Sequence, residues 1–233
     1  MAHPMHAPVF VTGATGYMGR ALCVRLLQEG LEVRGLVRAG SEGRLVRGVV
    51  PVPGDALHAA SYRDAIAPAR TLVHLVGTPH PNPRKARQFR DVDLASIRAA
   101  AAAASAAGVR HVVYVSVAHP APVMRAYVEA RIDGERALRE SGIPATVLRP
   151  WYVLGPGHRW PLALVPVYAL LERLPGTRES ARRLGLVTLH AMVDAMTDAV
   201  LHPAASWRVL DVPAIRAVAR GAAQRVPLPS VST

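Results

Sequence analysis

Cysteine is nearly absent from this chain of 233 residues, since Cys23 is the only one. A single thiol cannot form an internal disulfide, so the sequence excludes a disulfide framework and favours a reducing compartment. The ten histidines show no HExxH motif or other paired spacing that would indicate a metal site. His74 and His111 lie in or beside expected strands, where a packed histidine is more common than a ligand. We therefore expect no bound metal.

The sequence also lacks a long uninterrupted apolar run. The longest one outside the expected strands, residues 161–171, is far shorter than the about 20 residues that span a bilayer, and prolines interrupt it. The N-terminus shows no basic region followed by an apolar segment, so it does not resemble a signal peptide. We expect no transmembrane helix and a cytoplasmic location.

Lysine is as scarce as cysteine, although the formal net charge is +12 and Lys85 is the only lysine. The basic charge is therefore almost all arginine, spread from Arg20 to Arg225. A nucleic-acid site needs cations clustered on one face. We interpret the charge as a bias of the whole chain that attracts anionic ligands diffusely, and we expect no specific nucleic-acid partner.

Apolar runs and amphipathic segments alternate along most of the chain. Apolar residues make up 51% of the sequence, enough for one substantial core. The expected strands cover residues 8–12, 31–37, 49–52, 71–76, 110–117, 145–148 and 207–211. The expected helices cover residues 19–29, 94–107, 126–141 and 190–201. This alternation predicts an α/β fold with a doubly wound parallel sheet and helices on both of its faces.

The alternation weakens after Trp151, where prolines and glycines interrupt the chain. In a doubly wound fold this part would lie over the carboxyl ends of the strands, where ligands bind. We expect one domain over residues 1–233, with residues 151–190 as a small C-terminal substrate lobe or lid. The apolar residues 160–171 could line a pocket for a lipophilic or quinone-like substrate or rest on a membrane surface. A core-packed helix is the commoner role of such a segment.

The strongest motif is the run of residues 12–19, Thr-Gly-Ala-Thr-Gly-Tyr-Met-Gly, between the first strand and the first helix. Gly13 permits a tight turn, Gly16 lets the backbone approach a pyrophosphate, and Gly19 allows close helix-to-strand packing. The phosphates would lie at the positive N-terminus of the helix. The motif and its placement together predict a Rossmann-type dinucleotide site.

The end of the second strand indicates which dinucleotide binds. A site specific for NAD has an acidic residue there, which binds the ribose hydroxyls. This sequence has Arg38 instead, and a guanidinium can stack on adenine and bind a 2′-phosphate with two hydrogen bonds. NADP(H) is therefore favoured, NAD(H) remains the alternative, and Arg38 as one more surface arginine is the competing interpretation.

With these motifs the chain resembles the atypical short-chain dehydrogenase/reductase (SDR) family. It is most similar to the NAD(P)H-binding branch that includes accessory subunits of respiratory complex I and NmrA-like sensors. The resemblance covers nearly the whole chain and is carried by residues 12–19, 36–38, 54–55, 74–77, 114–116, 148–150 and 193–195. It places Asp55 and Ala56 near the adenine, Val76 and Gly77 near the ribose, and Pro150 and Trp151 near the nicotinamide.

The glycine motif and the resemblance together give a full set of expected cofactor-binding residues. They are Gly13, Ala14, Thr15, Gly16, Tyr17, Met18, Arg38, Asp55, Ala56, Val76, Gly77, Ser116, Tyr127, Arg131, Pro150 and Trp151.

The resemblance also implies a catalytic set of a serine and a Tyr-x-x-x-Lys pair. Ser116 and Tyr127 match it, whereas Arg131 stands at the lysine position. Four residues along a helix bring Tyr127 and Arg131 to one face, and a nearby cation favours the phenolate of a proton-exchanging tyrosine. Arginine cannot copy the compact ammonium's contacts with ribose hydroxyls, so activity could be reduced or lost. The competing interpretation of Tyr127 is a half-buried anchor of its helix.

The chain has no Gly-x-Ser-x-Gly elbow and no Walker loop, which argues against a hydrolase or an NTPase. Asp194 and Asp198 share one helical face and are expected to be solvated or capping charges. The leading hypothesis is an NADP(H)-dependent oxidoreductase acting on a small carbonyl, alcohol or quinone-like substrate. One alternative is a non-catalytic NADP(H)-binding sensor or accessory protein, and another is an NAD-dependent sugar-nucleotide epimerase or dehydratase.

Overall fold

The computed structural model describes residues 7–121, 123–156 and 184–225. The apolar segment 160–171 and most of the expected substrate lobe lie outside the described residues, so the lobe stays a prediction. Seven parallel strands form the main sheet in the order β3-β2-β1-β4-β5-β6-β9. They are β1 (Val9–Thr12), β2 (Val33–Val37), β3 (Val50–Pro53), β4 (Thr71–His74), β5 (His111–Val115), β6 (Ala145–Leu148) and β9 (Trp207–Leu210). The expected Rossmann-type doubly wound sheet is confirmed.

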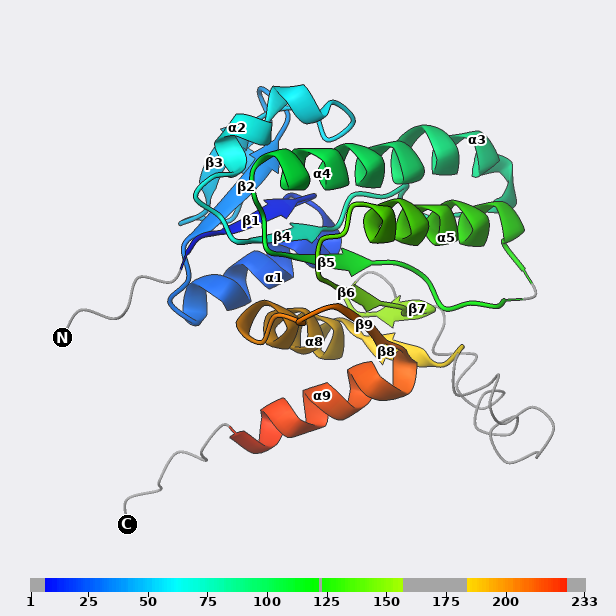
Figure 1. The fold of residues 1–233 in the computed structure, drawn as a ribbon. Helices are drawn as coiled ribbons and strands as arrows, with labels where there is room; N and C mark the ends of the chain where they lie inside the picture. The colour runs from blue at the N-terminus through cyan, green and yellow to red at the C-terminus, as the bar shows by residue number, and fades with distance from the viewer. Residues whose placement is uncertain (1–6, 122, 157–183, 226–233) are drawn as a thin grey trace, which may run out of the picture.

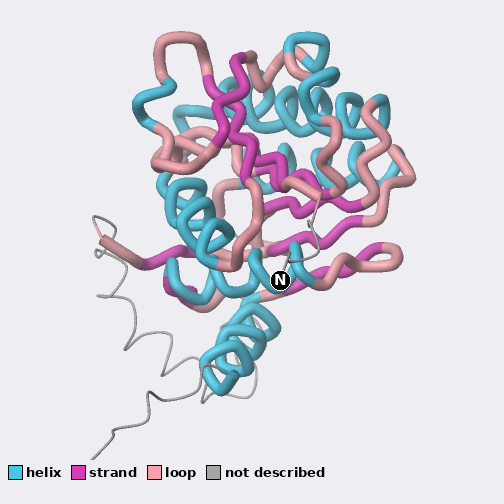
Figure 2. Tube along the Cα trace, turned by 90° about the vertical axis from the view of Figure 1, so that its left-hand side faces the viewer, coloured by secondary structure: helices cyan, strands magenta, loops and turns pink. Residues whose placement is uncertain are grey.

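Helices cover both faces of this sheet (Figures 1 and 2). Helices α1 (Tyr17–Gln28), α8 (Leu189–Leu201) and α9 (Val212–Arg225) lie on one side, and α4 (Ala95–Ala106) and α5 (Arg125–Glu140) lie on the other. The shorter elements are η1 (Glu42–Arg44), η2 (Ala59–Ser61), α2 (Arg63–Ile66), η3 (Pro83–Lys85), α3 (Ala86–Gln88) and the π-helical η4 (Phe89–Leu94). A separate two-stranded parallel sheet joins β7 (Tyr152–Leu154) and β8 (Leu186–Thr188).

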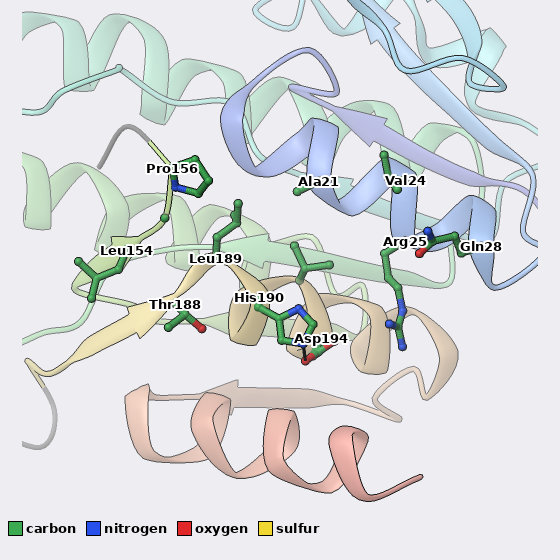
Figure 3. Close-up of a pocket in the computed structure, with 12 residues that line it drawn as sticks. Ala21, Val24, Arg25, Gln28, Leu154, Pro156, Thr188, Leu189, His190 and Asp194 are labelled. Atoms are coloured by element: carbon green, nitrogen blue, oxygen red, sulfur yellow. Dashed lines mark ion pairs between the residues drawn. The ribbon is translucent and has the colours of Figure 1, made fainter. Parts of the chain in front are cut away.

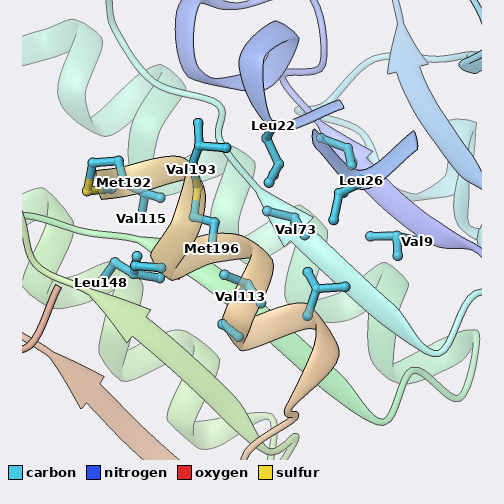
Figure 4. Packing of buried hydrophobic residues seen from close by; sticks show 14 of the residues in the cluster. Val9, Leu22, Leu26, Val73, Val113, Val115, Leu148, Met192, Val193 and Met196 are labelled. Atoms are coloured by element: carbon cyan, nitrogen blue, oxygen red, sulfur yellow. The ribbon is translucent and has the colours of Figure 1, made fainter. Parts of the chain in front are cut away.

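Two apolar cores hold the layers together, one on each face of the sheet. Neighbouring residues of a strand point to opposite faces, so Leu72 belongs to one core and Val73 to the other. Figure 4 shows the core beneath α1 and α8, where Leu22 and Leu26 of α1 meet Met196 of α8 over the strands. Burial on both faces explains why the strands are continuous apolar runs.

The sequence pattern missed the first turns of the long helix that ends in α4. This helix begins at Ala86 and contains the π-helical segment η4, whereas the expected helix began at residue 94. Phe89 and Leu94 are both buried and lie five residues apart. Because the wider π turn replaces the 3.6-residue spacing, the usual helical period is hidden there. Helix α9 and the β7–β8 pair were also missed.

His74 is packed in the interior, one of the two placements that the sequence interpretation favoured. Its Nδ1 lies 2.8 Å from Thr12 Oγ1 and its Nε2 lies 3.2 Å from Ser96 Oγ. Burial, helped by the charge of Arg131, lowers the pKa of His74 to about 3. The ring is therefore neutral and ties β1 and β4 to α4.

The two buried histidines predict a pH-dependent stability. Burial, and then the charge of Arg208, lowers the pKa of His111 to about 4, against an ordinary value of 6.5. A depressed pKa means that the stabilisation is complete above pH 6.5 and is lost as the pH falls, because only the unfolded state takes up the proton. We expect His74→Gln to reduce the slope of unfolding free energy between pH 6.5 and 4.5 by about 1.4 kcal/mol per pH unit. Urea titrations at several pH values measure this slope, and a His74→Gln variant with the wild-type slope would contradict the prediction.

Candidate active site

The glycine loop between β1 and α1 is packed too closely for side chains at two of its positions. A Cβ at Gly19 would lie 2.1 Å from the carbonyl oxygen of Gly13, and one at Gly13 would lie 2.9 Å from the carbonyl carbon of Leu75. Gly13 also has a φ of +75°, which favours glycine. Gly16 caps α1 without a side-chain hydrogen bond, and the first turn of the helix has no acidic residue. The helix start can therefore accept an anion.

A groove of about 370 Å³ runs from this loop along the carboxyl ends of β1, β2 and β4. Eight of the expected cofactor residues line it: Gly13, Thr15, Gly16, Arg38, Asp55, Ala56, Val76 and Gly77. They come from four separate parts of the chain, and the fold brings them together at one edge of the sheet. Ligands bind at such an edge in doubly wound folds.

Two arginines lie at the end of the groove that follows β2. Arg38 and Arg44 line it together with Ser41, and neither arginine forms an ion pair with a carboxylate in the described part of the chain. Asp55 also lines this end, and its pKa is lowered chiefly by a hydrogen bond from the backbone N–H of Leu57, then by His58, and least by the charge of Arg38. An unpaired pair of guanidinium groups suits a phosphate.

Arg131 is buried in a fixed arrangement at the other end of the groove. Its Nη2 donates to Asp93 Oδ1 at 2.7 Å, and its Nη1 donates to the carbonyl of Val115 at 3.0 Å. The side chains of Arg131 and Asp93 are 8% and 0% exposed, so the ion pair is almost completely removed from water. A Cβ at Gly77 would lie 2.3 Å from Arg131 Nη2, so the guanidinium packs directly under the groove's wall.

Asp93 belongs to the π-helical turn and holds a second element in place. Its Oδ2 accepts hydrogen bonds from the backbone N–H of Thr78 at 3.0 Å and from Thr78 Oγ1 at 2.6 Å. The carboxylate therefore fixes the loop after β4, which includes Val76 and Gly77, to Arg131 on α5.

Tyr127 lies beside Arg131 on the first turns of α5. The Arg131 guanidinium carbon is 5.3 Å from the centre of the Tyr127 ring. The centre of the Phe89 ring, at the start of η4, is 5.1 Å from the centre of the Tyr127 ring. The spacing of four residues thus places the two side chains together, as the sequence predicted. Within the described residues, no hydrogen bond engages the Tyr127 hydroxyl, so it is available to a substrate.

Ser116 lies at the end of β5 and is engaged with a residue that the sequence interpretation did not include. Its hydroxyl donates to Glu135 Oε1 at 2.6 Å, and the side chain is buried. Arg149 donates to both oxygens of Glu135, from Nε at 3.0 Å and from Nη2. Burial raises the pKa of Glu135, but the hydrogen bonds from His119, Arg149 and Ser116 outweigh it and lower the pKa to about 2. Ser116 therefore faces a carboxylate, and no hydrogen bond links it to Tyr127.

The remaining expected residues surround the groove without lining it. Ala14 is completely buried beneath the loop, and Met18 packs on the core below α1. Tyr17 begins α1, and a Cβ at Gly155 would lie 1.9 Å from its hydroxyl. Pro150 and Trp151 follow β6, where the Pro150 carbonyl accepts the N–H of Ala118 at 2.9 Å. Their distance from the groove leaves their nicotinamide contacts as predictions.

A larger hollow of about 1000 Å³ lies between α1 and α8 (Figure 3). Its lining is mostly apolar and includes none of the expected site residues, so size alone does not locate the chemistry here. His190 and Asp194 form an ion pair at 3.3 Å on its α8 side. Asp194 was expected to be a solvated or capping charge, and the solvated alternative is wrong, because its side chain is 4% exposed.

Two negative findings apply to the described residues alone. Across residues 7–121, 123–156 and 184–225, no group of three or more histidine, cysteine or acidic side chains could hold a metal ion. Nor is any helix in these ranges both long and apolar enough to cross a bilayer.

Residues 13–159 match the protein family described as NAD(P)H-binding. The chain is 34% identical over 185 residues to the ceramide reductase of Caulobacter vibrioides, covering 78% of this chain and 57% of that protein. It is 36% identical over 149 residues to the (4-alkanoyl-5-oxo-2,5-dihydrofuran-3-yl)methyl phosphate reductase of Streptomyces griseus, covering 61% and 46% respectively. The chain spans about half the length of the curated relatives that it matches.

The fold is similar to that of the Bordetella bronchiseptica enzyme WbmH in complex with NAD+. The TM-score is 0.66 at 18% sequence identity, and the match covers 98% of this chain and 84% of the other. At this identity the likeness shows the shared fold alone.

The Asp93–Arg131 pair predicts a large stability effect. Asp93→Asn leaves a buried guanidinium without its counter-charge, so we expect the free energy of unfolding to fall by about 3 kcal/mol. Adding Arg131→Met removes the unpaired charge and should restore at least half of that loss. Denaturant titrations measure both, and Asp64→Asn, which breaks an exposed pair with Arg63, should change stability by less than about 1 kcal/mol. A single variant as stable as wild type would show that the pair does not stabilise the site.

Proposed function

Because the chain belongs to the NAD(P)H-binding family and is an atypical SDR-like protein, we propose that it is an NADPH-dependent reductase of a carbonyl group in a lipophilic molecule. The observation that carries this proposal is the placement of Tyr127, whose hydroxyl is free of described partners, beside Arg131 and next to the wall of the cofactor groove. The relatives named as reductases of ceramide and of an alkanoyl-bearing phosphate support a substrate with an alkyl chain.

The residues of the groove fit a dinucleotide with an extra phosphate. The glycine loop leaves no room for side chains, and the uncapped start of α1 offers backbone N–H groups to the pyrophosphate. Arg38 and Arg44 would hold the 2′-phosphate of NADP(H), for which NAD(H) has no equivalent. When bound, the nicotinamide supplies the hydride, and the protein supplies orientation and the proton.

In this proposal Tyr127 donates the proton to the carbonyl oxygen as the carbonyl carbon is reduced. The guanidinium of Arg131, 5.3 Å from the ring centre, stabilises the negative charge that the tyrosine then carries. Arg131 also positions the Gly77 loop through Asp93, because both of its terminal nitrogens are engaged there and at Val115. In this proposal Arg131 acts on the cofactor site through this indirect role.

The role of Ser116 is narrower than the resemblance implies. A serine has one hydroxyl proton, and Ser116 donates it to Glu135 at 2.6 Å. A substrate carbonyl would have to compete with a buried carboxylate for that proton. We assign Ser116 to positioning Glu135 and Arg149 behind the site, rather than to orienting the carbonyl.

The engagement of Arg131 and of Ser116 favours a second candidate function, an NADP(H)-binding sensor or accessory protein without turnover. Arg131 is locked in an ion pair and Ser116 is engaged, so neither is free to contact substrate or ribose. A protein that only binds the dinucleotide needs neither contact.

Turnover and its dependence on Tyr127 separate the two candidates. With long-chain ketones as substrates, we expect NADPH oxidation by wild type and a fall in kcat of about 100-fold or more in Tyr127→Phe, with NADPH affinity unchanged. Absorbance of NADPH and fluorescence titration measure the two quantities. Tyr62→Phe, at a buried tyrosine outside the groove lining, is the control and should keep wild-type activity. Tight NADPH binding without oxidation in the presence of any carbonyl would favour the sensor.

Cofactor choice depends on the arginine pair. We expect Arg38→Ala and Arg44→Ala each to weaken NADPH binding about tenfold and to leave NADH binding nearly unchanged, since a charge-assisted phosphate contact is lost only with NADPH. Calorimetric titration with both dinucleotides measures this. Arg47→Ala removes an exposed arginine of the same segment that does not line the groove, and should change neither affinity. Equal weakening of NADH and NADPH would contradict the assignment.

A further inference from the structure

Four exposed arginines lie together at the carboxyl edge of the sheet, and we define them as the cationic rim: Arg84, Arg87, Arg90 and Arg125. The first three follow one another at intervals of three residues through η3, α3 and the start of η4. Arg125 begins α5 on the neighbouring element. Figure 1 shows α3 and the start of α5 side by side, and the contact of Phe89 with Tyr127 joins the two elements.

The segment that carries the rim is held rigidly. Phe89 is completely buried between the arginines and packs on Tyr127, so the opposite face of the segment points outward. Asn82 Oδ1 accepts the backbone N–H of Arg84 at 3.0 Å, and Lys85 Nζ donates to the carbonyl of Pro79 at 2.5 Å. The cations therefore project from a fixed backbone.

No described carboxylate neutralises the rim arginines, and what sets them apart is that they are clustered on one edge. Arg25, Arg63 and Arg136 each form an ion pair with a carboxylate on the surface. No such pair is found for the four rim arginines in the described ranges, although exposed Asp91 and Glu129 follow on the same two helices. Val123, an apolar side chain that is 52% exposed, precedes Arg125 by two residues. Unpaired cations next to an exposed apolar group match the surface of an anionic bilayer.

We propose that the cationic rim docks the protein onto anionic membrane lipids. Each cation near such a surface adds favourable electrostatic free energy, and the clustering on one edge makes these contributions simultaneous. Docking there would bring Tyr127, which contacts the rim segment through Phe89, close to the bilayer. The inference rests on the proposed function, because docking would bring the site to a lipophilic carbonyl substrate dissolved in that bilayer.

Co-sedimentation with vesicles tests the surface directly and without turnover. The probes are vesicles of phosphatidylcholine alone and of phosphatidylcholine mixed with phosphatidylglycerol. We expect binding to the mixed vesicles only, weakened about 100-fold in the triple variant Arg84→Gln/Arg87→Gln/Arg90→Gln. The matched control Arg47→Gln/Arg98→Gln/Arg110→Gln loses the same net charge at exposed arginines elsewhere and should keep wild-type binding. NADPH affinity and thermal stability should be unchanged in both.

Equal weakening by the two triple variants would overturn the inference, since it would show attraction by net charge alone. So would equal binding to neutral vesicles, or binding of the rim to a nucleic acid or to inorganic phosphate with no binding to mixed vesicles. Rim-dependent vesicle binding in a protein that never oxidises NADPH would support the docking surface while refuting the proposed reductase. Turnover with soluble ketones but no vesicle binding would support the proposed reductase and refute the docking surface.

Discussion

The ion pair between Arg131 and Asp93 is the interaction on which the geometry of the candidate site depends. It joins α5 to the π-helical turn, and Asp93 also binds the loop after β4. Among the described residues, no other ion pair connects these elements. Removing two charges from water is costly, and hydrogen bonds to each partner offset part of that cost. Asp93 accepts three hydrogen bonds, and Arg131 donates to Asp93 and to the Val115 carbonyl, whereas its buried Nε has no hydrogen-bond partner among the described residues. The wall of the candidate groove at Gly77 is fixed as a consequence.

The arginine at the expected lysine position makes sense within this arrangement. A guanidinium is planar and directs separate N–H groups to Asp93 and to the Val115 carbonyl, which a single ammonium cannot copy with the same geometry. One helical turn later, Glu135 accepts from Ser116 and Arg149 at the ends of β5 and β6. Helix α5 therefore clamps the carboxyl ends of three neighbouring strands through two buried charges.

Much of the fold and part of the candidate cofactor groove follow from local sequence, whereas the charge network does not. The glycine loop, the strands and Arg38 are recognisable because backbone sterics and burial leave a short-range pattern. Asp93 lies 38 residues from Arg131, and only the fold brings them together. The π turn also hid the helix that positions Asp93, since its spacing departs from the usual helical period. Arg44 had no distinguishing signal in a chain where arginine is common.

The arginine bias itself gains meaning from the pattern of partners. In the sequence it looked like a uniform excess, and in the fold some of the described arginines pair with a carboxylate whereas others do not. Arg131 and Arg149 are paired and build the interior of the site. Arg38 and Arg44 line one end of the carboxyl edge, and the cationic rim lies on the helices beyond β4 and β5, all without a described acidic partner. An unpaired cation on the surface retains its attraction for anions, so the same residue type builds a buried ion pair here and, in the proposals above, a groove for phosphate and an edge for lipid.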